Sequence, residues 1–198
     1  MVNKSVEDHQ ETAMDVDENS TMQQALMNEL RMKVQCDDVE GYLETYNQLN
    51  GQLPAGEVQS LLGDLCMSAC ELGHTSILAV TRQHCGINLP TVVDSITNHG
   101  LIHAAAAQNN GDTIRWLAGV GVNVDHADAA GRVALHAAAE NGNLEAVAIL
   151  AQDFNADIFI KDNWNISPVA LAQECGHLHV VNWLRDWRIQ NTTAPTRM

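Results

Sequence analysis

The stretch Gly131–Lys161, GRVALHAAAENGNLEAVAILAQDFNADIFIK, decides the fold of this chain. It opens with a turn glycine, and Gly142 interrupts the helical periodicity between two apolar runs. In the second run Val147, Leu150 and Ala151 recur at helical spacing. The pattern predicts two short helices joined by a turn that contains glycine, each too short to be stable alone. Such a hairpin buries its apolar face only by stacking on similar hairpins, so internal repeats are expected.

The turn residue Gly142 has counterparts at a nearly regular spacing along the chain. Gly176 is the next one, and Asn109 and then Gly73 precede Gly142 at similar intervals. Asparagine is the usual substitute for glycine where the backbone must be left-handed, so Asn109 fits the series. By the same reasoning Asn155 replaces the glycine that the period predicts near an inserted residue.

The segments around these turns agree column by column. LIHAAAAQNN, at 101–110, matches ALHAAAENGN, at 134–143, and SPVALAQECGH, at 167–177, occupies the same places. These columns and their spacing resemble the ankyrin-repeat family, whose signature T-P-L-H-x-A recurs at a period of about 33 residues. The resemblance implies an all-α solenoid of stacked helix–turn–helix repeats with short β-turn fingers. Four repeats follow from it, at about 56–93, 94–127, 128–161 and 162–187.

The signature itself is only partly kept. Only Ser167-Pro168 retains the proline, and only His103 and His136 retain the histidine. The first repeat is the weakest copy, because Leu65-Cys66-Met67 stands where P-L-H would, and its connection LPTVVDSITN is longer than the period requires. Such insertions should fall in loops, which tolerate them.

His103 and His136, one repeat period apart, invite comparison with a catalytic or metal-binding pair. No Ser, Cys or Asp recurs beside them in a nucleophile–base pattern, and the chain has neither a phosphate-binding glycine loop nor HExxH. The resemblance implies a structural histidine that hydrogen-bonds backbone between neighbouring repeats. We therefore expect no catalytic residue and no enzymatic activity.

Cys66, Cys70 and His74 stand at equal spacing, and His84-Cys85 follow. Cysteine and histidine suit tetrahedral zinc, so a zinc-dependent enzyme is one alternative. The other repeats place mostly apolar residues in the two cysteine columns, where cysteine behaves as a small hydrophobe. A packed core is the favoured interpretation, and no metal or cofactor is expected.

The composition limits the partners. With 25 acidic and 10 basic residues the net charge is −15, which should repel nucleic acid and anionic membranes and favour a protein partner with a basic surface. Five cysteines without paired spacing indicate a reducing compartment. No signal-peptide pattern and no run of about 20 apolar residues is present, so we expect a cytoplasmic protein, with the nucleus or a host-cell cytosol as alternatives.

The N-terminus divides at Ser20. Residues 1–19 hold six acids and one lysine, and such a composition favours a disordered tail. Ser20 or Thr21 then offers a helix N-cap, followed by glutamine where a capping box requires it. The expected organisation is a tail at 1–19, a repeat domain at 20–188 with a helical cap at about 20–53, and a short flexible tail at 189–198.

The resemblance also implies where a partner binds. In the family the fingers and first helices line a concave face, and the second helices form the convex back. Trp164 is the most notable residue, because it lies at a finger tip and either anchors a partner or covers the neighbouring finger. The expected partner-binding residues are His99, Gln108, Arg132, Glu140, Asn141, Trp164, Ile166, Gln173 and Glu174.

We therefore expect a monomeric protein–protein interaction module that acts as an adaptor or inhibitor without catalysis. A microbial or viral effector that acts on a host protein is an alternative that the residues do not separate from an endogenous adaptor, because one fold serves unrelated targets.

Overall fold

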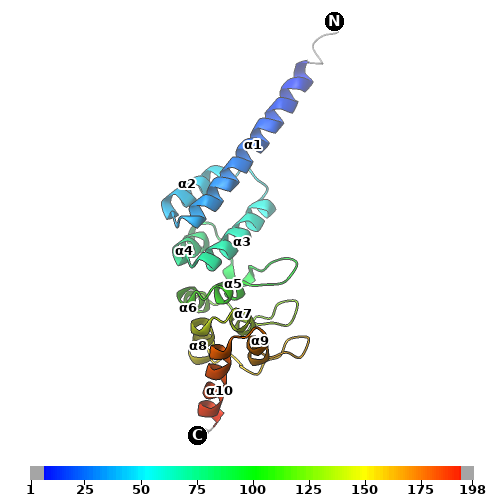
Figure 1. The fold of residues 1–198 in the computed structure, drawn as a ribbon. Helices are drawn as coiled ribbons and strands as arrows, with labels where there is room; N and C mark the ends of the chain where they lie inside the picture. Colours follow the sequence, from blue (N-terminus) through cyan, green and yellow to red (C-terminus); the bar gives the residue numbers. More distant parts are fainter. Residues whose placement is uncertain (1–6, 193–198) are drawn as a thin grey trace.

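The structure, a computed structural model, describes residues 7–192 as a stack of helical hairpins (Figure 1). Within that range no strand forms, and only Val93 and Gly100 make an isolated β-bridge. The expected all-α solenoid is thus confirmed. The helices are α1 Glu7–Gln35, α2 Val39–Leu49, α3 Ala55–Leu72, α4 Thr75–His84, the 3-10 turn η1 Leu89–Thr91, α5 Leu101–Ala107, α6 Gly111–Gly119, α7 Ala134–Glu140, α8 Leu144–Gln152, α9 Pro168–Glu174 and α10 Leu178–Thr192.

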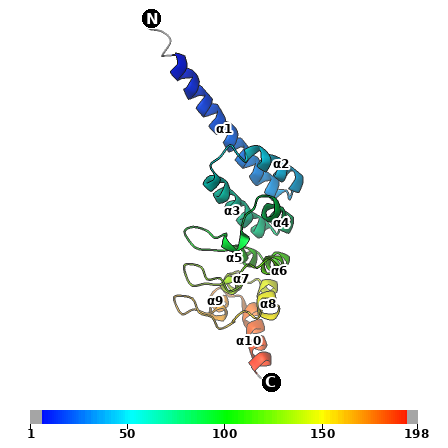
Figure 2. The same cartoon turned by 180° about the vertical axis from the view of Figure 1, so that it is seen from behind.

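The hairpins stack so that their helices form two rows (Figures 1 and 2). Helices α3, α5, α7 and α9 contact one another in sequence in the first row, and α4, α6, α8 and α10 do so in the second. The connections that precede α5, α7 and α9 all project to the same side of the stack, where they form the fingers. The first helices and the fingers therefore share one face of the molecule.

Small side chains allow the first-row helices to lie close together. Ala104–Ala106 on α5 and Ala138–Ala139 on α7 are buried, and Leu101, Leu135 and Leu150 belong to the same core. Each hairpin alone would leave this surface in water, so its stability depends on the hairpins on either side.

The turns between paired helices follow the sequence prediction. Gly142 has φ 72°, and Asn109 and Asn155 have φ 60° and 54°, so both asparagines occupy the left-handed region expected of them. After the turn, Asn143 donates from Nδ2 to the carbonyls of Ala106 and Ala107 at 2.9 and 2.8 Å. The turn of one repeat therefore closes the helix end of the preceding one.

The structure differs from the sequence expectation at both ends. Helix α1 begins at Glu7, so the expected N-cap at Ser20-Thr21 lies inside a helix and that prediction is wrong. Residues 7–19 contain no proline or glycine and include good helix formers, so nothing local stops the helix at Ser20. Helix α10 likewise runs to Thr192, into the tail predicted to be flexible. Residues 1–6 and 193–198 lie outside the described residues.

Deleting residues 1–19 is expected to leave the thermal midpoint and the circular dichroism of the remaining helices nearly unchanged. The N-terminal half of α1 projects beyond the other helices (Figure 1), and among the described side chains of α1, from Ser20 onward, the first buried one is Leu26. Thermal unfolding of the shortened and full-length chains measures the difference. A midpoint that falls well beyond experimental error would show that this segment contributes to the packed domain.

Candidate functional site

Three aspartates shape the fingers in the same way. Asp94, Asp128 and Asp162 recur at the repeat period, and each uses Oδ1 to accept backbone N–H groups from its own finger. In the third finger the donors are Trp164 N at 2.9 Å and Ile166 N at 2.8 Å. Each turn is therefore fixed by its own aspartate, and the residue two positions after the aspartate stands at the tip.

Neighbouring fingers are joined by backbone hydrogen bonds. The amide of Ala129 donates to the carbonyl of Thr97 at 2.8 Å, and that of Asn163 donates to the carbonyl of Ala130 at 3.0 Å. The side-chain amide of Asn98 adds a bond to the carbonyl of Ala127 at 3.0 Å. The three fingers consequently form one connected edge, the finger edge, which loses little conformational freedom when a partner binds.

The finger tips present apolar side chains to solvent. Trp164 is 67% exposed, which argues against the alternative that it covers the neighbouring finger. Ile96 occupies the same place in the first finger and is 87% exposed, with Ala130 between them in the second. Sequence reasoning missed Ile96, although the repeat column that contains Trp164 would have found it.

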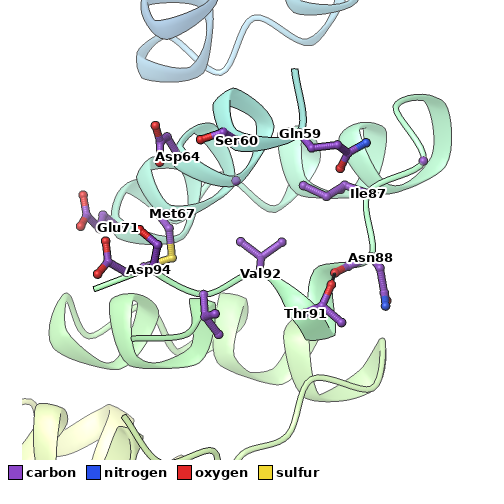
Figure 3. A pocket seen from close by; sticks show the side chains of 14 residues that line it. Gln59, Ser60, Asp64, Met67, Glu71, Ile87, Asn88, Thr91, Val92 and Asp94 are labelled. Atoms are coloured by element: carbon purple, nitrogen blue, oxygen red, sulfur yellow. Dashed lines mark hydrogen bonds between the residues drawn. The ribbon is translucent and has the colours of Figure 1, made fainter. Parts of the chain in front are cut away.

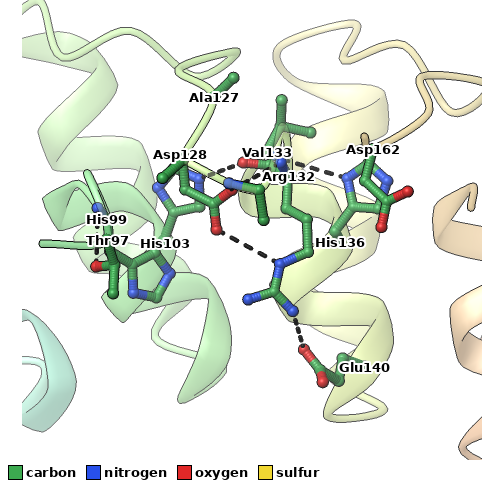
Figure 4. Close-up of polar contacts among 12 residues, drawn as sticks. Thr97, His99, His103, Ala127, Asp128, Arg132, Val133, His136, Glu140 and Asp162 are labelled. Carbon is green, nitrogen blue, oxygen red and sulfur yellow. Dashed lines mark hydrogen bonds and ion pairs between the residues drawn. The ribbon is translucent and has the colours of Figure 1, made fainter. Parts of the chain in front are cut away.

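The signature histidines lie at the base of the fingers (Figure 4) and are structural, as predicted. His103 accepts the Gly100 amide at Nδ1 over 3.2 Å, so its proton is on Nε2, which donates to the carbonyl of Arg132 at 3.0 Å. His136 repeats the arrangement with the Val133 amide and the carbonyl of Ile166, at 3.2 and 3.1 Å. Both imidazoles are buried, and burial lowers their pKa, for His103 to about 4. Each ring joins two repeats in its neutral form.

Arg132 does not offer a free positive charge to a partner. Its Nη1 donates to Glu140 Oε2 at 3.1 Å, and its Nε lies 3.4 Å from Asp128 Oδ2 (Figure 4). Two of the expected binding residues, Arg132 and Glu140, thus neutralise each other. With His99 and Asn141 they surround a hollow of about 80 Å³ between the first helices of the second and third repeats.

The remaining expected binding residues are dispersed. Gln108 and Glu174 are exposed at the C-terminal ends of α5 and α9, whereas Ile166 is half-buried and its carbonyl is used by His136. Gln173 accepts a hydrogen bond from Arg185 of α10 at 3.2 Å. The structure therefore groups His99, Arg132, Glu140 and Asn141 in one place and leaves the fingers and helix ends as a separate region.

The cysteines of the first repeat belong to the core. Cys66 and Cys70 are fully buried, and burial raises the pKa of Cys66 to about 12 and that of Cys70 well above its usual value. Their burial supports the packed-core interpretation, in which each cysteine acts as a small apolar side chain. Among the side chains that the structure describes, at residues 20–191, no three of His, Cys, Asp or Glu are grouped as a metal ion requires.

With this geometry in view, the fold is that of a repeat solenoid whose fingers and first helices share one face. Residues 65–162 and 101–194 match the family model for ankyrin repeats in three copies. The chain belongs to the ankyrin-repeat family, which makes it a protein-interaction module of a generally non-catalytic class.

The chain is similar to several known proteins. It is 31% identical over 94 residues to the mitochondrial liver isoform of glutaminase from Rattus norvegicus, covering 46% of this chain and 16% of the enzyme. It is 28% identical over 130 residues to ankyrin repeat domain-containing protein 37 from Xenopus tropicalis, covering 65% and 74%. It is 41% identical over 71 residues to human ankyrin repeat domain-containing protein 63, covering 36% and 18%. Because the chain spans only a small part of the glutaminase, it does not acquire that enzyme's activity from the match.

A solved structure shares the fold. A chain in the crystal structure of the yeast ribosomal protein Rps3 in complex with its chaperone Yar1 superimposes with a TM-score of 0.58 and 23% identity, covering 68% of this chain and 96% of that one.

None of the helices described between residues 7 and 192 is long and apolar enough to span a membrane.

Proposed function

We propose that the protein binds a partner protein along its concave face and acts as an adaptor or inhibitor without catalysis. The observation that carries this proposal is the edge of three hydrogen-bonded fingers, which presents Ile96, Ala130 and Trp164 at equivalent positions. An exposed tryptophan on a rigid edge is the kind of residue that supplies much of the binding energy at protein interfaces.

The charge of the chain supports a basic partner. The net charge of −15 attracts a basic surface and repels nucleic acid and anionic membranes. We further propose that the protein is a monomer and acts in the cytoplasm, where its cysteines stay reduced. The thiols of Cys36, Cys66, Cys70, Cys85 and Cys175 are all free, which is compatible with a reducing compartment.

Replacing Trp164 by alanine is expected to weaken partner binding by at least about 2 kcal/mol, or about thirtyfold in Kd. Trp164 is 67% exposed and lies at a finger tip, so its truncation should leave folding intact. Crosslinking in extracts of the source cell, followed by a titration with the purified partner, measures the effect.

The control for this experiment is Glu145→Ala, an exposed position on α8 in the second row of helices. Because α8 lies away from the fingers, its variant should bind like the unmodified protein. If the Trp164→Ala and Glu145→Ala proteins both fold and both bind normally, the finger edge is not the binding site.

A further inference from the structure

A hollow in the first repeat lies away from Trp164 and from the ion pairs of Arg132. It has a volume of about 680 Å³ and separates the exposed side of α3 from the connection at 86–95, which includes η1 (Figure 3). A volume of this size is within the range of sites that hold a ligand of several functional groups. We call this hollow the first-repeat groove.

The groove exists because the connection of the first repeat is anchored at a few points. Leu89 and Val92 are buried and hold the connection against the stack, and a Cβ added at Gly63 on α3 would lie 3.8 Å from Cγ1 of Val92. The extra residues of LPTVVDSITN, which the repeat period does not require, therefore form one wall of the groove.

The two ends of the groove differ in charge. Asp64, Glu71 and Asp94 gather at one end, whereas the amides of Gln59 and Asn88 lie at the other (Figure 3). The described lining contains no lysine or arginine, so these carboxylates have no cation within the groove. Asp94 uses Oδ1 for its own finger, and neither Asp64 nor Glu71 forms an ion pair among the described residues.

Three cations elsewhere on the described chain are paired with carboxylates of their own regions. Lys33 pairs with Asp38, Arg115 with Asp112 and Asp153, and Arg132 with Asp128 and Glu140. The first-repeat groove is instead a hollow with excess negative charge and an apolar centre formed by Met67 and Val92. A segment of a partner protein that complements this groove would carry basic side chains next to uncharged residues.

We propose that the first-repeat groove binds an extended, lysine- and arginine-rich segment of the partner protein. Its basic side chains lie at Asp64, Glu71 and Asp94, its uncharged residues cover Met67 and Val92, and its main chain meets the amides of Gln59 and Asn88. The inference rests on the proposed function and gives the partner a chemical class. It also adds a second contact area to the finger edge.

The test uses the full chain and a fluorescein-labelled dodecapeptide of alternating arginine and alanine, followed by fluorescence anisotropy. The same peptide with glutamate in place of arginine serves as the probe of opposite charge. The double variant Asp64→Asn/Glu71→Gln is expected to weaken binding of the basic peptide by about tenfold, because two exposed ion pairs are lost. Both carboxylates are exposed, so neither substitution disturbs the core.

The matched control is Glu145→Gln/Asp186→Asn, which makes the same change in net charge at exposed positions on α8 and α10. It should alter the peptide affinity by less than about twofold. An equal loss in both double variants would show general charge attraction and overturn the groove proposal, as would a basic peptide that does not bind. Amide chemical shifts of the unmodified protein that change elsewhere than on α3 and residues 86–95 would overturn it too.

The two proposals fail separately. If a natural partner requires Trp164 while the arginine peptide does not bind, the finger edge stands and the groove proposal falls. If the peptide binds as expected and no partner depends on Trp164, the groove stands and the finger edge is wrong as the main contact area.

Discussion

Lowering the pH from 7 to 4 is expected to decrease the free energy of unfolding by about 3 kcal/mol through His103 alone. The side chain of His103 is fully buried, and burial lowers its pKa to about 4, although the hydrogen bond to the Arg132 carbonyl favours the charged form. A histidine in the unfolded chain has a pKa near 6.5. Below that pH the unfolded chain therefore binds a proton that the folded chain does not, and stability is lost until His103 is protonated in the folded chain as well, below about pH 4.

The pH window separates this effect from that of the carboxylates. Hydrogen bonds from backbone N–H groups hold the pKa of Asp94 below the usual 3.8. At Asp128 burial raises the pKa, but the hydrogen bonds from the Arg132 and Ala130 amides together with the nearby Arg132 charge lower it by more, so it also lies below 3.8. Their contributions to stability are therefore lost only at lower pH. His136, whose pKa burial also lowers, acts in the same direction as His103. Urea unfolding at several pH values between 7 and 4 measures the combined loss.

A double variant, His103→Gln/His136→Gln, provides the control. It should be less stable than the unmodified protein at pH 7, because it loses hydrogen bonds between repeats, yet its stability should change less between pH 6.5 and 4. An unmodified protein with equal stability at pH 6.5 and pH 4 would contradict the assignment of neutral, buried histidines.

Replacing Gly142 by valine is expected to decrease the free energy of unfolding by about 2–3 kcal/mol. Gly142 has φ 72°, which a β-branched residue adopts only with strain, and an added Cβ would lie 2.6 Å from Nδ1 of His177. The imidazole cannot simply move away, since its Nε2 donates to the Glu140 carbonyl at 2.9 Å. Strain and steric conflict therefore coincide at this turn.

Gly119→Ala is the matched control for that substitution. Gly119 ends α6, its φ is not positive, and an added Cβ would meet no atom within 4 Å. Alanine has the higher helix propensity, so this variant should be more stable by up to about 1 kcal/mol. Thermal or urea unfolding measures the stability of both variants. If Gly142→Val were as stable as the unmodified chain, the turn would tolerate a side chain at this position.

The repeat period explains why so much of the fold was predictable. It predicted four hairpins after residue 55, and it identified Asn109 and Asn155 correctly as left-handed turn residues. The error at Ser20 has a different origin. A capping box is a short local pattern, and the residues before Ser20 favour helix as much as those after it, so the pattern alone does not end a helix there.

The candidate site was less predictable, because it depends on contacts that the period does not contain. Periodicity placed Trp164 at a finger tip, but not the ion pair in which Glu140 neutralises Arg132. The sequence did not predict the first-repeat groove, because one wall of the groove is the irregular connection of the first repeat. This connection has no matching positions in the other repeats. Leu89 and Val92 of that connection are buried, which the repeat period does not reveal.

The bonds between the third and fourth repeats also decide how the stack deforms under load. They occur at three levels: Asn163 to Ala130 between the fingers, His136 to Ile166 at the helix start, and His177 to Glu140 at the turn. Sliding one repeat over the next would break all three together, whereas a small tilt stretches each only slightly. Under force we therefore expect the stack to bend slightly at each interface between repeats. Neighbouring repeats should not slide past one another.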